Sequence, residues 1–361
     1  MNAATNPGRS ALVVGGTGIA GRALCRELAA QGWQTTSLSR RLTAPQDGVE
    51  TVRADLTDPQ SVQAALAGLN PTHVFFTAWS RRPSEAENIA VNAAMVRNVL
   101  DTTGPSGNLQ HVGLVTGLKH YLGPFEAYGT GATRDTPFHE DEPRLEAPNF
   151  YYAQEDELWQ AAEHYRFAWS VHRSHTMIGH AVGNAMNLGQ TLAAQAALCR
   201  AEGLPFVFPG NEVQWNGITD MTDTGLLARQ MIWAATTPGL PSQAYNTANG
   251  DVFRWRWMWP RIARLLGVEP EGYAHQPRPL EEQMAGKADM WRQLAEREGL
   301  AEPDLTRVAS WWHTDSDLNR PVECFTDMTR SRNAGFTGYA DTLTAFATLF
   351  NTLRDERVIP A

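Results

Sequence analysis

Two side chains near the middle of the chain, Lys119 and Tyr151, are of types that together can act on a substrate oxygen. A phenol, with a reference pKa of about 10, is a poor acid at neutral pH, but a neighbouring positive charge favours its ionised form. Tyr151 supported by Lys119 is therefore suited to donate a hydrogen bond or a proton to an oxygen that gains negative charge. Lysine is rare here: of 30 basic residues only Lys119 and Lys287 are lysines.

The elements around this pair predict that both side chains reach the same crevice. Residues 110–117 form an apolar run typical of a strand, and Lys119 follows it in what we expect to be a loop. Tyr151 begins the next helix, for which Asn149 is the expected N-cap. Acidic residues 155–157 suit the positive end of that helix dipole.

A glycine-rich turn near the N-terminus predicts a nucleotide site rather than an ordinary surface turn. Residues 11–16 read as a buried strand, and the chain continues at helical spacing after a turn of the form GxxGxxG. Glycine lets the backbone approach a pyrophosphate, and the helix N-terminus offers free N–H groups to it. The turn residues expected at the nucleotide are Gly15, Thr17, Gly18, Ile19 and Gly21.

The second expected strand, residues 34–39, indicates which dinucleotide is bound. It ends in Ser39, Arg40 and Arg41, at the point where an acidic residue would bind the ribose 2′-hydroxyl of NAD. Arginine accommodates a 2′-phosphate instead, so NADPH is favoured over NADH. The alternative is that the two arginines are solvated surface residues.

The ends of the next strands supply further expected cofactor contacts. The third strand, within residues 49–58, leads to Asp55, which can reach an adenine amino group or can cap a helix from Pro59. The fourth strand, residues 72–79, is expected to end beside the cofactor. The contacts expected from these and the later strands are Asp55, Leu56, Thr77, Ala78, Trp79, Thr116, Met177 and Ile178.

The order of these elements predicts the fold class. Strands alternate with helices through the first half, so we expect an α/β fold with a Rossmann-type, doubly wound parallel sheet. The expected NADP-binding domain is 1–180 with returns at about 219–250, and 181–218 with 251–361 form a smaller, mainly helical substrate lobe. Six tryptophans in that lobe are expected in its core more than in a pocket. They are Trp255, Trp257, Trp259, Trp291, Trp311 and Trp312.

Composition excludes several classes of protein. A net charge of -9 and a pI near 5.6 argue against nucleic-acid binding. Three widely spaced cysteines favour neither disulfides nor zinc and fit a reducing cytoplasm. No apolar run is long enough for a membrane span. His172, His175 and His180 lack the spacing of metal ligands, so no metal is expected.

Several segments carry a family resemblance. VTGLKHYLGPFEAYG, EDEPRLEAPNFYYAQEDEL and WSVHRSHTMIG resemble the progesterone 5β-reductase/iridoid synthase-like family of extended short-chain dehydrogenases, and the similarity continues through ECFTDMTRSRNAGF. By position, Lys119 and Tyr151 match the family's catalytic lysine and tyrosine. The lysine that ordinary short-chain dehydrogenases place four residues after the tyrosine is replaced here by Glu155. Ser174 stands where the family typically has proline, so the shape of that loop, and hence the substrate, is expected to differ.

The resemblance implies an NADPH-dependent reductase of enone and enal C=C bonds. Hydride would reach the β-carbon, and Tyr151 with Lys119 would stabilise the enolate oxygen. A small-molecule substrate is implied. Dimers are common among relatives, so a homodimer is one option, but the sequence does not fix the oligomeric state. The alternatives are a carbonyl reductase or epimerase/dehydratase-type enzyme on the same fold, and a non-catalytic NADP-binding sensor.

Overall fold

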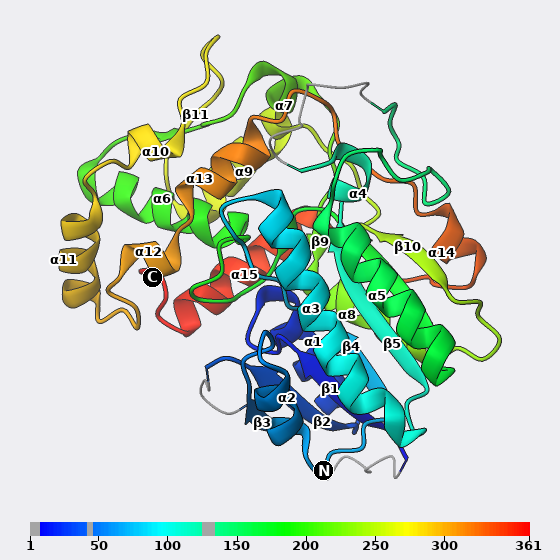
Figure 1. Cartoon of the computed structure of the whole chain (residues 1–361). Coiled ribbons are helices and arrows are strands. Elements are labelled where there is room, and N and C mark those ends of the chain that lie inside the picture. The colour runs from blue at the N-terminus through cyan, green and yellow to red at the C-terminus, as the bar shows by residue number, and fades with distance from the viewer. Residues whose placement is uncertain (1–7, 42–45, 125–133) are drawn as a thin grey trace.

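A single parallel sheet organises the chain in a computed structural model that describes residues 8–41, 46–124 and 134–361 (Figure 1). Its seven strands lie in the order β10-β6-β5-β4-β1-β2-β3 and all pair in parallel. The strand order reverses between β1 and β4, which is where open α/β sheets bind ligands. The strands are β1 Ser10–Val14, β2 Gln34–Ser39, β3 Val49–Arg53, β4 His73–Phe76, β5 His111–Gly117, β6 Ala168–Ser174 and β10 Gln243–Thr247.

Successive residues of β1 show why the sheet is covered on both faces. Side chains alternate between the faces of a strand. Leu12 and Val14 pack into one hydrophobic cluster with residues of α3 (Glu85–Thr103) and α5 (Phe150–Tyr165). Ala11 and Val13 pack into another cluster, with residues of α1 (Ile19–Ala30) and α8 (Thr224–Thr236). Figure 1 shows α3 and α5 side by side across the front of the sheet. The predicted Rossmann-type fold is therefore confirmed.

Local capping explains where the helices begin. Ser84 and Glu87 form a capping box at α3, with Ser84 Oγ accepting from the Glu87 N–H. Asn149 caps α5 by accepting from the Tyr151 N–H at 3.0 Å, as predicted. Asp55 does not cap α2 (Pro59–Leu66); Asp58 does, accepting from Gln60 N at 3.0 Å. Asp55 instead accepts from Thr57 two residues on, because it lies too far before the helix.

Two other expectations differ from the structure near the sheet edge. β4 ends at Phe76, so Thr77 to Trp79 leave the sheet. No acidic residue lies in the first turn of α5, so residues 155–157 do not act at its N-terminus.

The smaller, mainly helical part has its own hydrophobic core. Trp255, Trp259 and Trp291 are at most 2 % exposed within it, as expected for core tryptophans. Trp257 differs: it is 46 % exposed, with the Arg261 guanidinium over its ring. The helices of this part are α6 Leu188–Glu202, α7 Glu212–Asn216, α9 Trp255–Leu266, α10 Leu280–Gln283, α11 Ala288–Glu298, α12 Leu305–Val308, α13 Trp311–Leu318 and α15 Thr342–Asp355.

The chain returns to the sheet after it has entered the helical part. α8 packs against the sheet and β10 extends it, although both follow the first segments of the helical part. The short elements are η1 Gly104–Ser106, α4 Lys119–Leu122, α14 Thr329–Asn333, β7 Met177–Ile178 paired with β9 Thr222–Asp223, and β8 Phe206–Val207 paired with β11 Pro270–Glu271. Among the described helices, none is both long and apolar enough to cross a membrane.

Buried histidines make the stability of this fold sensitive to acid. Burial lowers the pKa of His73 and His172 to about 4 and of His111 and His120 to about 3. Below a pH of about 6.5 the unfolded chain takes up protons on these imidazoles while the folded protein does not. Stability is therefore lost as the pH falls from about 6.5 toward these folded values, by about 1 kcal/mol per histidine at pH 5.5. The pKa of Asp315, which burial raises to about 6, offsets part of this loss.

We expect the free energy of unfolding to fall by several kcal/mol between about pH 7.5 and 5.5, measured by urea denaturation. The variant His172→Gln should have a shallower pH dependence, because one of the titrating imidazoles is gone. A free energy of unfolding that stays constant over this range would contradict the prediction.

Candidate functional site

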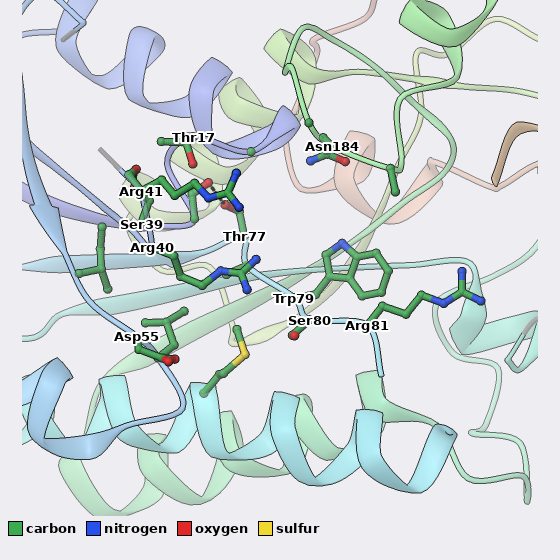
Figure 2. A pocket seen from close by; sticks show the side chains of 18 of the residues that line it. Thr17, Ser39, Arg40, Arg41, Asp55, Thr77, Trp79, Ser80, Arg81 and Asn184 are labelled. Carbon is green, nitrogen blue, oxygen red and sulfur yellow. Dashed lines mark hydrogen bonds between the residues drawn. The ribbon is translucent and has the colours of Figure 1, made fainter. Parts of the chain in front are cut away.

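A cleft of about 560 Å³ opens at the carboxyl ends of β1, β2 and β4, at the reversal of strand order. Figure 2 shows side chains from several loops directed into it, including the guanidinium groups of Arg40 and Arg41. Eleven of the predicted cofactor contacts line it: Gly15, Thr17, Gly18, Ser39, Arg40, Arg41, Asp55, Leu56, Thr77, Ala78 and Trp79.

The glycine turn is built for close approach to an anion. Gly15 has φ +85°, and a Cβ atom there would lie 3.0 Å from Ala78. A Cβ atom on Gly21 would lie 2.2 Å from the carbonyl oxygen of Gly15, so only glycine lets the helix pack on the turn. Gly18 begins α1 without a side-chain cap, and the first turn has no acidic residue. The positive end of α1 is therefore open to a negatively charged ligand.

The charge of the cleft is opposite to that of the chain. Five arginines and one aspartate line it, which gives a formal charge of +4 in a protein of net charge -9. The pKa of Asp55 is lowered most by a hydrogen bond from the backbone N–H of Thr57 and next by one from the Thr57 hydroxyl. The positive charges of Arg40 and Arg82 lower it slightly further. The cleft is therefore suited to a ligand with several phosphate groups. Its charged residues are Arg40, Arg41, Asp55, Arg81, Arg82 and Arg307.

Sequence reasoning missed part of this cleft. Met95 of α3 lines it, as do Ser80 to Arg82 after β4, residues 182–185 and Arg307. No local pattern singles out the last two, because they come from the helical part and reach the cleft only through the tertiary fold. Three predicted contacts are not among the lining residues of either cavity: Ile19 and Gly21, which lie in α1, and Ile178, which lies in β7.

A second cavity, of about 80 Å³, brings Lys119 and Tyr151 together with Thr116 and Met177. Lys119 lies in the first turn of the short helix α4 and not in a loop, because the chain turns immediately after β5. The remaining lining residues of the second cavity are Gly117, Leu118, Ser174, His175, Thr176, Met186, His313, Asp317 and Arg320.

Asn149 links the two residues of the predicted pair. Its Nδ2 donates to the backbone oxygen of Lys119 at 2.6 Å, while its Oδ1 accepts from the Tyr151 N–H at 3.0 Å. The Lys119 ammonium lies 5.3 Å from the centre of the Phe150 ring, which also contacts Tyr151 with ring centres 4.4 Å apart. The end of β5 and the start of α5 are thus held together by one side chain that spans them.

The Tyr151 phenol is buried above the end of β5. A Cβ atom on Gly117 would lie 3.5 Å from its oxygen, an ordinary contact distance, so the phenol lies beside the last residue of β5. Burial raises the pKa of Tyr151, and the negative charges of Glu85 and Asp317 raise it further. In the protein alone the phenol is protonated at neutral pH and available as a hydrogen-bond donor.

Glu155 occupies the position of the lysine that follows tyrosine in ordinary short-chain dehydrogenases. Its side chain is fully buried and accepts from Arg144 Nη2 at 2.9 Å, with Arg173 Nη2 at 3.9 Å. Burial raises the pKa of Glu155, and Arg173 and Arg144 oppose that shift. This carboxylate therefore has a structural role in the α5 region and does not line the second cavity.

A network of buried charged side chains forms the far wall of the second cavity. His175 Nδ1 lies 2.5 Å from Asp220 Oδ1, and Arg320 Nη1 lies 2.6 Å from His175 Nε2. Arg320 also donates to Asp317 at 2.5 Å and to Thr176 Oγ1 at 2.9 Å. Burial lowers the pKa of His175, so this imidazole is neutral and accepts from the guanidinium.

Ser174 and the nearby histidines have structural partners. Ser174 is the last residue of β6 and not part of a loop, and its hydroxyl donates to the Thr116 carbonyl at 3.1 Å. His172 contacts Ser170 Oγ at 2.9 Å, and His180 contacts a Glu356 carboxylate at 2.9 Å. In the described part of the chain no group of histidine, cysteine and carboxylate side chains has the arrangement of a metal site.

Solved structures with similar folds include epimerases. A UDP-glucose 4-epimerase from Thermus thermophilus in complex with NAD is 18 % identical, with a TM-score of 0.65 over 95 % of this chain and 99 % of that one. An epimerase from Methanothermobacter thermautotrophicus is 15 % identical, with a TM-score of 0.69 over 96 % of this chain and 94 % of that one. At these identities the likeness shows the fold.

Relatives found by sequence have a higher sequence identity to this chain than these solved structures have. An (S)-8-oxocitronellyl enol synthase from Camptotheca acuminata is 36 % identical over 97 % of this chain and 93 % of its own length. A 3-oxo-Delta(4,5)-steroid 5-beta-reductase from Arabidopsis thaliana is 35 % identical over 97 % of this chain and 93 % of its own length. A family model described as a PRISE-like Rossmann-fold domain matches residues 48–360. The chain therefore belongs to the PRISE family, the progesterone 5β-reductase/iridoid synthase-like group that its motifs resemble.

Proposed function

We propose that this protein is an NADPH-dependent reductase of activated C=C bonds in small-molecule enones and enals. The observation that carries the proposal is the placement of Lys119 and Tyr151, joined through Asn149, in a cavity at the carboxyl edge of the sheet. The relatives support it, since they are named as a steroid 5-beta-reductase and as enol synthases that share the family.

The shape and charge of the larger cleft suit NADPH. The uncapped start of α1 and the close approach at Gly15 and Gly21 suit a diphosphate, and Arg40 and Arg41 suit the 2′-phosphate. Asp55, which also lines the cleft, would accept a hydrogen bond from the adenine amino group. When bound, NADPH supplies the hydride for the reduction.

The side chains of the second cavity would act on the substrate oxygen. Tyr151, whose pKa is raised further above neutral by burial, donates a hydrogen bond to the carbonyl oxygen of the enone. As the β-carbon is reduced, negative charge moves to that oxygen and the bond strengthens. The Lys119 ammonium, placed by the turn after β5, stabilises the same charge. The pair thus favours 1,4-reduction through an enolate.

Arg40→Ala tests the choice of cofactor. We expect it to weaken NADPH by at least about 10-fold and NADH hardly at all, because NADH has no 2′-phosphate for the guanidinium to bind. Titration of each cofactor measures the two Kd values, with Arg53→Ala as a control at an arginine outside the cleft lining. Equal weakening of both cofactors by Arg40→Ala would exclude a role at the 2′-phosphate.

Two alternatives use the same fold. A carbonyl reductase or epimerase would act on a C=O or CH–OH group. Glu155, which is buried and bound to Arg144, stands where ordinary short-chain dehydrogenases have their lysine, and this argues against the catalytic arrangement of those enzymes. A sensor would bind NADP without turnover. Incubation with NADPH and 2-cyclohexen-1-one distinguishes them: cyclohexanone supports our proposal, 2-cyclohexen-1-ol supports carbonyl reduction, and binding without turnover of any enone in a panel supports the sensor.

A further inference from the structure

The helical part of the chain closes the larger cleft with a short segment, residues 182–185, which we call the strap. All of its residues line the cleft. It approaches the start of α1, because a Cβ atom on Gly18 would lie 3.7 Å from Nδ2 of Asn184. Figure 2 shows Asn184 and Thr17 on opposite sides of the same part of the cleft. The strap therefore covers the region beside the helix N-terminus.

Arg307, in α12, is held against this strap. Its guanidinium faces Gly183, where an added Cβ atom would lie 3.6 Å from Nη1, 3.7 Å from Cζ and 3.9 Å from Nη2. The Gly183 N–H donates to the Arg307 carbonyl oxygen at 2.6 Å. Glu302 accepts from Arg307 Nε at 2.6 Å, which fixes the orientation of the guanidinium. Arg307 and the strap are thus one unit, and both line the cleft.

Two positive groups therefore meet at this end of the cleft. The N-terminus of α1 carries the positive end of the helix dipole, and no acidic residue lies in its first turn. Arg307, which is ion-paired through Nε with Glu302, adds its guanidinium from the other side, on a side chain that is 42 % exposed and lines the cleft. An anion between them would be bound from both sides, once by backbone N–H groups and once by a guanidinium.

We propose that Arg307 binds the diphosphate of the dinucleotide from the helical part of the chain, an inference that rests on the proposed NADPH function. The cleft then divides its positive charge. Arg40, after β2, serves the 2′-phosphate, and Arg307 serves the diphosphate that NADPH and NADH share. Because Arg307 belongs to the part of the chain that also carries α13 with His313 and Asp317, the bound cofactor joins the sheet to the wall of the substrate cavity.

Binding measurements test this division without any enone substrate. The Kd values of NADPH, NADH and 2′-AMP, which carries a 2′-phosphate but no diphosphate, are measured for the wild type, Arg307→Gln and Arg307→Lys. Arg307→Gln should weaken NADPH and NADH equally, by about 10-fold, and leave 2′-AMP unchanged. Arg307→Lys should recover most of the loss. Arg297→Gln, on the exposed end of α11, is the matched control and should bind all three as the wild type does.

The outcomes separate this inference from the proposed function. If Arg307→Gln changes NADPH and NADH by less than about twofold, or weakens 2′-AMP as much as NADPH, the diphosphate role is wrong. If the wild type binds neither dinucleotide, the proposed cofactor itself is wrong. Melting temperatures of the variants equal to that of the wild type would show that a changed affinity reflects lost binding and not a loss of folding.

Discussion

Replacing Tyr151 with phenylalanine is expected to lower kcat by about 100- to 1000-fold and to change the Kd of NADPH by less than about twofold. The phenol oxygen acts on charge that develops in the transition state, so its removal affects turnover and not the ground-state binding of the cofactor. The cofactor phosphates are proposed to bind in the larger cleft, whose lining does not include Tyr151. Steady-state kinetics with 2-cyclohexen-1-one and a separate cofactor titration measure the two quantities.

Tyr165 offers a matched control for this substitution. It lies at the end of the same helix, α5, and its hydroxyl contacts Asp101 at 3.2 Å on the exposed surface. Tyr165→Phe should leave both kcat and the Kd of NADPH unchanged. A variant Tyr151→Phe that loses cofactor affinity in parallel with turnover, or that keeps the kcat of the wild type, would show that Tyr151 does not have the assigned role.

Replacing Gly21 with alanine is expected to weaken NADPH by about 100-fold, because the glycine turn cannot keep its shape. The added Cβ atom would lie 2.2 Å from the Gly15 carbonyl oxygen and 2.8 Å from the Gly16 Cα atom. Both neighbours are backbone atoms, so α1 has to move away from the turn. That displacement moves the N-terminal N–H groups away from the diphosphate.

The control for this variant is Gly8→Ala, a glycine with no atom within 4 Å of the added Cβ position. It should bind NADPH as the wild type does. Cofactor titration and thermal unfolding measure the two effects for both variants, and we expect Gly21→Ala to lower the free energy of unfolding by about 1–3 kcal/mol as well. Wild-type affinity in Gly21→Ala would mean that the turn does not hold the diphosphate.

Local sequence patterns were sufficient for the sheet and for the glycine turn. The bounds of β2 match the strand expected at residues 34–39, and the α5 cap follows from Asn149 placed just before a helical run. These features depend on neighbours along the chain. The family, recognised from the segments around Lys119 and Tyr151, is confirmed by the matching family model.

Features that depend on distant contacts could not be predicted in this way. Arg307 and the strap reach the cleft only because the helical part folds back over α1. Two aspartates, Asp55 and Asp58, precede α2. The path of the backbone makes Asp58 the N-cap. The raised pKa of Tyr151 follows from its burial, which no spacing of residues reveals.

The position of the transferred hydride tests the central claim most directly. The protein is incubated with 2-cyclohexen-1-one and NADPH that carries deuterium at the transferable position, and the product is identified by mass spectrometry and NMR. We expect cyclohexanone with deuterium at C3, the β-carbon of the enone. Deuterium at C1 of 2-cyclohexen-1-ol would contradict it, because the hydride would then have gone to the carbonyl carbon.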